Sequence, residues 1–431
     1  MPSQVAALPD DRAQADRTAR TDGNDNLCQI RLQQLKLRNF RNHRQIDLST
    51  DSNAVILTGP NGAGKTNILE AISLLAPGRG LRRAKTDMLA YRPTTSEAIW
   101  PAAASTGNDI AAEEIAGAAG CASWSVSALL ETAEGPIRAG TGSTADAATA
   151  SRQQRLNGAA ASQADLAACF AISWLTPEMD GVLSGAASGR RRFLDRLVIS
   201  FDPAHAGRLN RHEKLLRQRN RLLEAGSGDD HWHQALEAQL AEVAVAIIAA
   251  RLTLTQALDE MAAIPVPGFP AGRLKLAGSV EDWLRKMPAV DVEDRIRAEA
   301  RETRLGGALA MPSANGSLLT VTHSATGQPA ELCSTGEEKA LLVGLVLAHA
   351  RLQTARLQRP LLLLLDDIAS HLDGQRRDAL FAMTATLPGQ VWYSGTEWAL
   401  FAGFGPAACH IDVGTAARCR RSIPGPLTRT G

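Results

Sequence analysis

A glycine-rich octapeptide between a predicted strand and a predicted helix constrains the fold of this chain more than any other feature. It fits the pattern G-x-x-x-x-G-K-[ST] and consists of Gly59, Pro60, Asn61, Gly62, Ala63, Gly64, Lys65 and Thr66. The apolar run 54–57 predicts the strand before it, and the apolar spacing within 66–75 predicts the helix after it. Glycines let the backbone turn so that successive N–H groups face phosphate oxygens, and the helix adds the positive end of its dipole. The octapeptide therefore predicts a phosphate-binding loop in an α/β protein.

The last two residues of this loop are the expected ligands of ATP and of Mg²⁺. We expect Lys65 to reach the β- and γ-phosphates and Thr66 to place its hydroxyl on the metal. The alternative is an ordinary glycine-rich turn, but the strand before the loop and the helix after it favour nucleotide binding.

A run of five leucines, 361–365, ends in the pair Asp366 and Asp367. Continuous apolar residues after Pro360 are typical of a fully buried parallel strand, and open α/β sheets bind ligands at the carboxyl ends of such strands. We expect Asp366 to hold Mg²⁺, directly or through water, and Asp367 to orient or deprotonate the attacking water. The alternative is that the two aspartates only end the strand and begin a turn.

Ser334, Gly336 and Glu337 stand at the start of the predicted helix 337–357. Ser334 followed by Glu337 is a capping box, and a capped helix start is one reading of the segment. The other is an anion site, because a glycine-containing helix N-terminus attracts phosphate. Its place about 30 residues before the aspartate pair matches the signature motif of ATPases that hold nucleotide between two subunits. In those ATPases the serine meets the γ-phosphate bound to the partner's P-loop.

Two shorter segments follow the aspartate pair. Ser370 to Asp373 occupies the place of the D-loop of such ATPases, although Asp373 can equally cap the predicted helix 373–386. At 394–396 the chain has Ser-Gly-Thr where transporter ATPases have a histidine switch, which leaves Thr396 as a candidate γ-phosphate sensor.

The order of these motifs resembles the SMC-related ATPases and, among them, the RecF family. The segments that carry the resemblance are 35–42, 59–72, 77–82, 176–180, 190–196, 214–220 and 365–373. The resemblance covers about residues 30–400 and implies an ABC/SMC-type α/β P-loop ATPase head built from both chain ends. We expect a disordered extension at 1–27, head segments at 28–185 and 311–431, and an inserted helical lobe at 186–310. Two segments depart from the family. The segment 313–319 lacks the Gly-Pro-His-Arg motif that the family has before the signature, and 92–120 is an unusual insertion.

The resemblance also implies a function. RecF proteins bind ATP, dimerise around two nucleotides, and bind DNA at single-strand gaps or junctions between single-stranded and duplex DNA. They help mediator proteins of the RecO/RecR type to load recombinase, which supports repair, replication and the SOS response. Their ATP hydrolysis is slow and resets the dimer. A cytoplasmic protein with no membrane contact is expected.

The charge of the chain weakens any assignment of DNA-binding residues. Its net charge is only +1, and 7 of its 46 basic residues are lysines, a bias that lowers the weight of any single arginine. The candidate phosphate contacts are Arg190, Arg191, Arg192 and Arg196, and the basic face of 211–221 formed by Arg211, Lys214, Arg217 and Arg221. The alternative is a solvated helix face.

Two other functions remain open from the sequence. An ATPase subunit of a membrane transporter shares these motifs, but the 300 residues between Thr66 and Asp366 disfavour it. A DNA scaffold that holds ATP without hydrolysing it is the second. No apolar run approaches the roughly 18–20 residues that span a bilayer. The cysteines at 28, 121, 169, 333, 409 and 419 contain no C-x-x-C pair, which favours reduced thiols in a cytoplasm.

Overall fold

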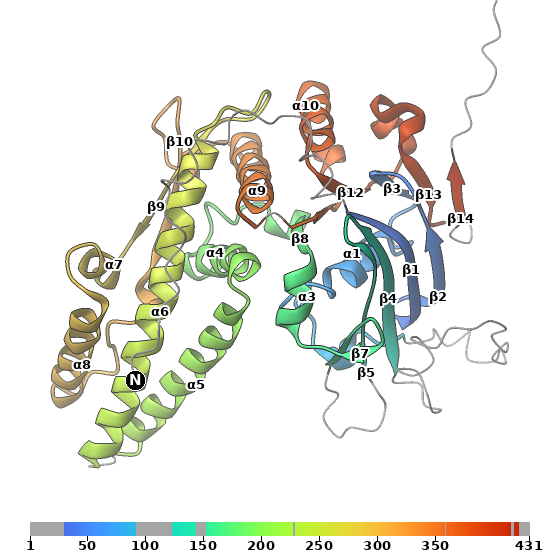
Figure 1. The fold of residues 1–431 in the computed structure, drawn as a ribbon. Coiled ribbons are helices and arrows are strands. Elements are labelled where there is room, and N and C mark those ends of the chain that lie inside the picture. The colour runs from blue at the N-terminus through green and yellow to red at the C-terminus, as the bar shows by residue number, and fades with distance from the viewer. Residues whose placement is uncertain are drawn as a thin grey trace, which may run out of the picture.

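The fold contains two six-stranded sheets of different kinds, and one of them carries both the glycine-rich loop and the aspartate pair (Figure 1). The computed structural model describes residues 30–91, 123–143, 152–226, 229–357, 359–414 and 418–421. The expected N-terminal extension, 1–27, and the expected insertion, 92–120, lie outside the described residues.

The first sheet is mostly parallel and contains strands from both ends of the chain. In order, its strands are β14 (Arg418–Arg421), β13 (Cys409–Asp412), β3 (Ala54–Thr58), β12 (Gly389–Ser394), β11 (Leu361–Leu365) and β8 (Ala171–Leu175). Only β14 pairs antiparallel, to β13. All five leucines of β11 are buried, and the strand pairs parallel with β12 and β8, which confirms the predicted buried parallel strand. Because β3, β11 and β12 run parallel, the P-loop and the aspartate pair emerge at the same edge of the sheet.

The second sheet is antiparallel and covers the P-loop helix, α1 (Lys65–Ser73). In order, its strands are β2 (His43–Ser49), β1 (Ile30–Phe40), β4 (Trp124–Thr132), β5 (Gly135–Ser143), β6 (Arg152–Leu156) and β7 (Ala159–Ala160). Apolar residues of α1 share one buried cluster with β1 leucines and with Leu362 and Leu364 of β11. Helix α1 is therefore held between the two sheets, which fixes the start of the helix against the phosphate-binding loop.

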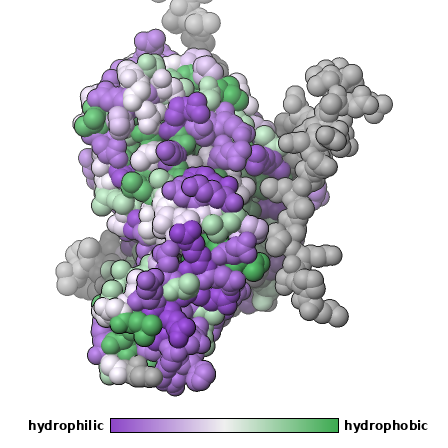
Figure 2. Space-filling model, turned by 90° about the vertical axis from the view of Figure 1, so that its left-hand side faces the viewer, coloured by the Kyte–Doolittle hydropathy of each residue, from purple (hydrophilic) through white to green (hydrophobic). Residues whose placement is uncertain are grey.

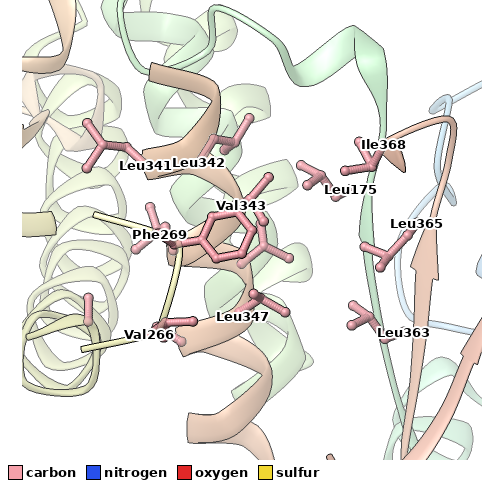
Figure 3. Packing of buried hydrophobic residues seen from close by; sticks show 14 of the residues in the cluster. Leu175, Val266, Phe269, Leu341, Leu342, Val343, Leu347, Leu363, Leu365 and Ile368 are labelled. Atoms are coloured by element: carbon pink, nitrogen blue, oxygen red, sulfur yellow. The ribbon is translucent and has the colours of Figure 1, made fainter. Parts of the chain in front are cut away.

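Helix α9 (Thr335–Leu357) covers the opposite face of the parallel sheet. Figure 3 shows Leu341, Leu342, Val343 and Leu347 on α9, with Leu363 and Leu365 on one side and Val266 and Phe269 on the other. A helix that is apolar on every side must be buried on every side, and the middle of α9, from Glu338 to Ala350, is buried on nearly every side between the sheet and the helical part of the chain.

The helical part has its own core. It comprises α4 (Ala187–Phe201), α5 (Ala204–Glu224), α6 (Asp230–Ala262), α7 (Ser279–Leu284) and α8 (Ala289–Leu305) (Figure 1). Residues of α5, α6, α7 and α8 form a separate apolar cluster, and Arg219 and Glu237 form a fully buried ion pair beside it.

One element of this region differs from the helical expectation. Strand β9 (Gly272–Ala277) interrupts the helices and pairs antiparallel with β10 (Leu318–His323). Leu274 and Leu276 are buried while Arg273 and Lys275 are exposed, a period of two that a helical pattern does not contain. The alternation was present in the sequence, but it covers only six residues between a proline-rich segment and a helical one. So short a pattern does not outweigh the helical prediction for the residues around it.

Helices α6 and α9 are long and apolar enough to cross a membrane by length and composition, in the part of the chain that the structure describes. Both are mostly buried inside the protein, as core helices are. Figure 2, which views the helical side of the molecule, shows a largely hydrophilic surface with separate hydrophobic spots.

His349 is a buried polar group that makes stability depend on pH. Its Nε2 lies 3.2 Å from the carbonyl oxygen of Leu197, and Phe201 packs edge-on against the ring. Burial lowers the pKa of His349 to about 3. In the unfolded chain His349 takes up a proton near its ordinary pKa of 6.5, whereas in the folded chain it stays neutral until the pH falls to about 3. The free energy of unfolding therefore decreases as the pH drops from 6.5 towards 3.

We expect His349→Gln to remove this pH dependence. Urea unfolding of the wild type should lose up to about 1.4 kcal/mol per pH unit between pH 6.5 and 5 from this one group. The variant is less stable at pH 7.5 but should lose less on acidification. Equal losses in both proteins would show that His349 is not the responsible group.

Candidate nucleotide-binding site

The P-loop has the backbone that phosphate binding requires. Gly59, Gly62 and Gly64 have φ angles of 143°, 83° and 100°, a region that favours glycine. No side chain caps the N-terminus of α1, so its first N–H groups are available to an anion. The Nζ of Lys65 donates to the carbonyl oxygens of Gly59 at 2.6 Å and Pro60 at 2.9 Å. The ammonium is thus already within the loop, although burial lowers the pKa of Lys65 against the attraction of Asp367 and Asp366.

Three oxygen-bearing side chains meet beside the loop. The Thr66 hydroxyl donates to the Asp366 carboxylate at 2.9 and 3.0 Å, across 300 residues of sequence. The hydroxyl of Ser394, at the end of β12, donates to Asp366 Oδ1 at 2.6 Å. Burial raises the pKa of Asp366, although the hydroxyls oppose it. An all-oxygen set with one carboxylate fits Mg²⁺, which usually binds one or two carboxylates together with substrate phosphates.

Asp367 lies beside this group but faces solvent. Its backbone is left-handed, with φ 50°, and its N–H donates to the Ser394 hydroxyl at 2.9 Å. The Ser370 hydroxyl donates to Asp367 Oδ1 at 2.7 Å, and Nε2 of His371 lies 3.6 Å from Oδ2. The Asp367 side chain as a whole retains 37% exposure. Thr396, the candidate γ-phosphate sensor, lies two residues beyond Ser394 and is exposed. The side chain that contacts both aspartates is that of Ser394.

The turn between β1 and β2 forms a wall of the site that residue patterns did not reveal. Asn42 Nδ2 donates to the Gly62 carbonyl at 3.3 Å, and His43 Nε2 lies 3.1 Å from the Gly64 carbonyl. Burial is the main cause that lowers the pKa of His43. Arg41 binds the buried carboxylate of Glu70, on α1, through two hydrogen bonds of 2.8 and 2.6 Å. No residue spacing in the sequence predicts that a polar turn packs on a P-loop, because the contact between turn and loop depends on how the two sheets pack against each other.

Arg82 is a second residue of the site whose role the sequence patterns did not predict. Its Nη1 donates to Oδ1 of Asn67 at 2.6 Å, and it lies 3.6 Å from Glu70 and 4.0 Å from Glu178. Its positive charge lowers the pKa of Asp366, so it adds a cation beside the aspartate pair.

The signature segment begins α9 as a capping box. The Ser334 hydroxyl donates to the Glu337 carboxylate at 2.8 Å and accepts from the Glu337 N–H at 3.3 Å. Ser334 and Gly336 are exposed, and no hydrogen bond or ion pair joins 334–337 to the P-loop of the same chain, both segments being described. Asp373 caps α10 (Gly374–Ala385) by accepting from the Arg376 N–H at 2.8 Å.

Helix α9 is anchored by the two residues that follow the capping box. Glu338 accepts from the N–H of Ser184 at 2.9 Å, and Lys339 pairs with Asp180 at 2.7 Å. Both partners lie in the segment that follows β8, so the exposed start of α9 has a fixed position relative to the parallel sheet.

The predicted DNA contacts separate into two groups. Arg190 is buried and pairs with Glu331 at 2.7 Å, and Arg196 stacks over Trp174 and Phe193. These two side chains act within the fold, because burying them beside a carboxylate or aromatic rings removes them from a ligand. Arg191 donates to the Ser317 carbonyl at 3.1 Å, whereas Arg192 is exposed.

The basic face of α5 is exposed, as predicted, but acidic residues accompany it. Arg211 lies 3.8 Å from Glu242, and Arg217 lies 3.8 Å from Glu213. Such pairs reduce the positive potential that the helix presents to a polyanion.

The chemistry of the whole arrangement is that of a triphosphate site. The loop N–H groups, Lys65 and Arg82 supply positive charge, Thr66 and Asp366 bring together oxygens of the kind that Mg²⁺ accepts, and Asp367 adds a second carboxylate. Such a group can bind a nucleotide and orient a water molecule against its terminal phosphate.

Comparison with known proteins agrees with this geometry. The family model described as the RecF/RecN/SMC N-terminal domain matches residues 31–391. The chain is 43% identical to the DNA replication and repair protein RecF of Mesorhizobium japonicum, over 90% of this chain and 97% of that protein. It is 42% identical to the RecF of Rhizobium etli strain CIAT 652, over 89% and 97%.

Among solved structures, the fold matches two of the recombination mediator protein RecF in the RecFOR pathway. The structure with ATP gives a TM-score of 0.68 at 19% identity and covers 91% of this chain and 99% of the other. The structure with ATPrS gives a TM-score of 0.71 at 18% identity, with 90% and 98% covered.

Proposed function

This chain belongs to the RecF family within the RecF/RecN/SMC ATPases, and from that premise we propose that it is an ATP-dependent DNA-binding protein of recombinational repair. It hydrolyses ATP slowly with Mg²⁺, dimerises on ATP, and binds DNA at single-strand gaps or at junctions between single-stranded and duplex DNA. Mediators of the RecO/RecR type are its partners in loading recombinase, in support of the SOS response, in the cytoplasm.

The observation that carries this proposal is the contact between Thr66 and Asp366, 300 residues apart in sequence. It supports one site made from the P-loop and the aspartate pair. In that site the N–H groups of the loop 59–66 bind phosphate oxygens, and Lys65 exchanges its carbonyl partners for the β- and γ-phosphates. Thr66 and Asp366 would hold Mg²⁺, which when bound neutralises charge on the phosphates. Asp367 Oδ2, which Ser370 leaves free, orients the water or accepts its proton.

The exposed signature segment supports a second part of the proposal. Ser334 and Gly336 have no hydrogen bond or ion pair with the P-loop of their own chain, and they stand at an exposed, capped helix N-terminus. We assign them to the γ-phosphate bound by a second copy, so that two chains enclose two nucleotides. The transporter alternative loses its support, because the relatives that match almost the whole chain are repair proteins.

The family relationship and the sheet composition also support the proposed boundaries. Strands β3 and β8 come from 28–185 and β11 to β13 from 311–431, and they share one sheet. The separate apolar cluster of α5 to α8 supports a helical lobe at 186–310.

Replacing Ser334 by aspartate tests the composite site without removing the helix cap. Aspartate caps helices as well as serine, so α9 should remain intact, but its carboxylate would repel the γ-phosphate. We expect wild-type protein to sediment as a dimer with ATP and to bind gapped DNA more tightly. Ser334→Asp should bind ATP but remain a monomer, and ATP should not tighten its binding to gapped DNA. Ser334→Thr should behave nearly as wild type.

A mixture of two inactive variants makes the test specific to a shared site. Combining Ser334→Asp with Lys65→Arg leaves one intact site in each mixed dimer, because the P-loop of one chain meets the signature of the other. Random pairing should then restore up to about a quarter of wild-type turnover. A mixture as inactive as its components would contradict the shared site, and a wild type that neither dimerises nor gains DNA affinity with ATP would contradict the function.

A further inference from the structure

Basic side chains from three distant segments gather where the loop after α1 approaches α4. They are Arg79, Arg83 and Lys85 in the loop, Arg152 at the start of β6, and Arg192 on α4. Arg79, Lys85 and Arg152 line one cavity of about 480 Å³. Arg83 joins this group to α4: partial burial of its guanidinium, and then the positive charges of Arg192 and Arg79, lower its pKa, with Asp195 opposing them.

These cations lack the partners that other arginines of the protein have. Arg79, Arg83, Lys85 and Arg192 are exposed and form no ion pair or hydrogen bond with any other residue described by the structure. One acid, Asp87, lines the cavity. Asp195 is nearby, but Arg251 and His205 already bind its carboxylate at 2.8 to 2.9 Å. The positive charge here is therefore largely uncompensated, and like charges held together without a counter-charge repel one another.

The loop holds this arrangement in a defined shape. Gly78 has both backbone groups bound: its N–H donates to Gln163 at 2.9 Å and its carbonyl accepts from Arg152 at 2.7 Å. The Leu81 N–H donates to the Ser73 hydroxyl at 2.7 Å, which ties the loop to α1. Arg83 itself adopts φ 56°, a left-handed conformation that is strained for a non-glycine residue. Such strain persists where the surrounding contacts impose it.

We propose that Arg79, Arg83, Lys85, Arg152 and Arg192 form a binding surface for backbone phosphates of DNA. This rests on the proposed DNA-binding function and says where on the chain the contact lies. Several cations spread over exposed loop, cavity and helix suit a polyanion with regularly spaced charges better than one small anion. The α5 face is the weaker candidate, since Glu213 and Glu242 lie against its arginines.

The test compares two triple variants of the full-length protein with ATP present. Arg79→Ala/Arg83→Ala/Arg192→Ala removes the proposed contacts, and Lys214→Ala/Arg217→Ala/Arg221→Ala removes the same number of charges from α5. Affinity for a gapped duplex and for its single strand is measured from low to moderate salt. Each lost phosphate contact lowers the slope of log affinity against log salt by about one. The first variant should lose about three units of slope and at least about tenfold in affinity, and the α5 variant should lose little.

A lysine version of the first variant separates charge from shape. Arg79→Lys/Arg83→Lys/Arg192→Lys should recover most of the slope, because a phosphate contact needs the charge rather than the fork. All variants should still dimerise with ATP. An unchanged slope in the alanine variant, or a larger loss in the α5 variant, would overturn the proposal while leaving ATP-dependent DNA binding intact. Unchanged DNA binding with loss of an acidic protein partner would also overturn it. Failure of the wild type to bind DNA would instead refute the proposed function.

Discussion

Lys65→Arg is expected to lose ATP turnover by about 10²- to 10³-fold and to lose the ATP-dependent dimer, as expected when one donor to developing charge is removed. The Nζ of Lys65 lies within hydrogen-bonding distance of two carbonyl oxygens inside the loop, at 2.6 and 2.9 Å. That space accepts a compact ammonium. A planar guanidinium is larger and directs its donors in a fixed fork, so it cannot take the same position.

Phosphate release and sedimentation with ATP measure the effect. Lys275→Arg is the matched control, because this lysine is exposed on β9 and lies outside the site. Thermal unfolding without nucleotide should be nearly equal for the variant and the wild type, which separates a lost phosphate contact from a lost fold. If Lys65→Arg dimerises with ATP as the wild type does, the loop does not control assembly.

Asp367→Asn is expected to slow hydrolysis by about 10²- to 10⁴-fold while leaving nucleotide binding intact. Asparagine has nearly the same shape, and its Oδ1 can still accept from Ser370, so the left-handed backbone at this position is retained. The amide cannot take a proton from water. Because binding and dimerisation precede hydrolysis, the ATP dimer should accumulate and persist.

Sedimentation at intervals after a single addition of ATP distinguishes the outcomes. Wild type should return to monomer as ATP is consumed, whereas Asp367→Asn should remain dimeric. Asp282→Asn, at an exposed ion pair on α7, is the control. If Asp367→Asn hydrolyses ATP like the wild type, the assignment of this carboxylate is wrong. If the wild type holds a dimer without turnover, the protein is the non-hydrolysing DNA scaffold instead.

Local patterns predicted the parts of the site that are continuous in sequence. The P-loop, the buried strand 361–365 and the capping box at Ser334 each combine a strong residue pattern with a short-range structural cause. The helical insert was expected from the family resemblance, and the basic face of 211–221 lies on α5. Strand β9 was missed because six residues of alternation carry little weight inside a helical region.

The arginines show where pattern alone misleads. Arg190 and Arg192 are two residues apart and equivalent in the sequence, yet the first is buried against Glu331 and the second is exposed. Burial of one position on a helix depends on which neighbour covers that face. Glu331 is 141 residues away, so no local signal distinguishes the two.

The sequence by itself determined a glycine-rich loop between a strand and a helix, a pair of aspartates at the end of a buried strand, and a family relationship, because these depend on backbone conformations and side chains that are adjacent along the chain. Only the tertiary structure decided what surrounds them. It brought Thr66 to Asp366, placed Ser394 between the aspartates, and packed Asn42 and His43 on the loop. It also gathered Arg79, Arg83 and Arg192 without partners. Such contacts depend on the register of strands and the packing of helices from separate parts of the chain, which no single segment encodes.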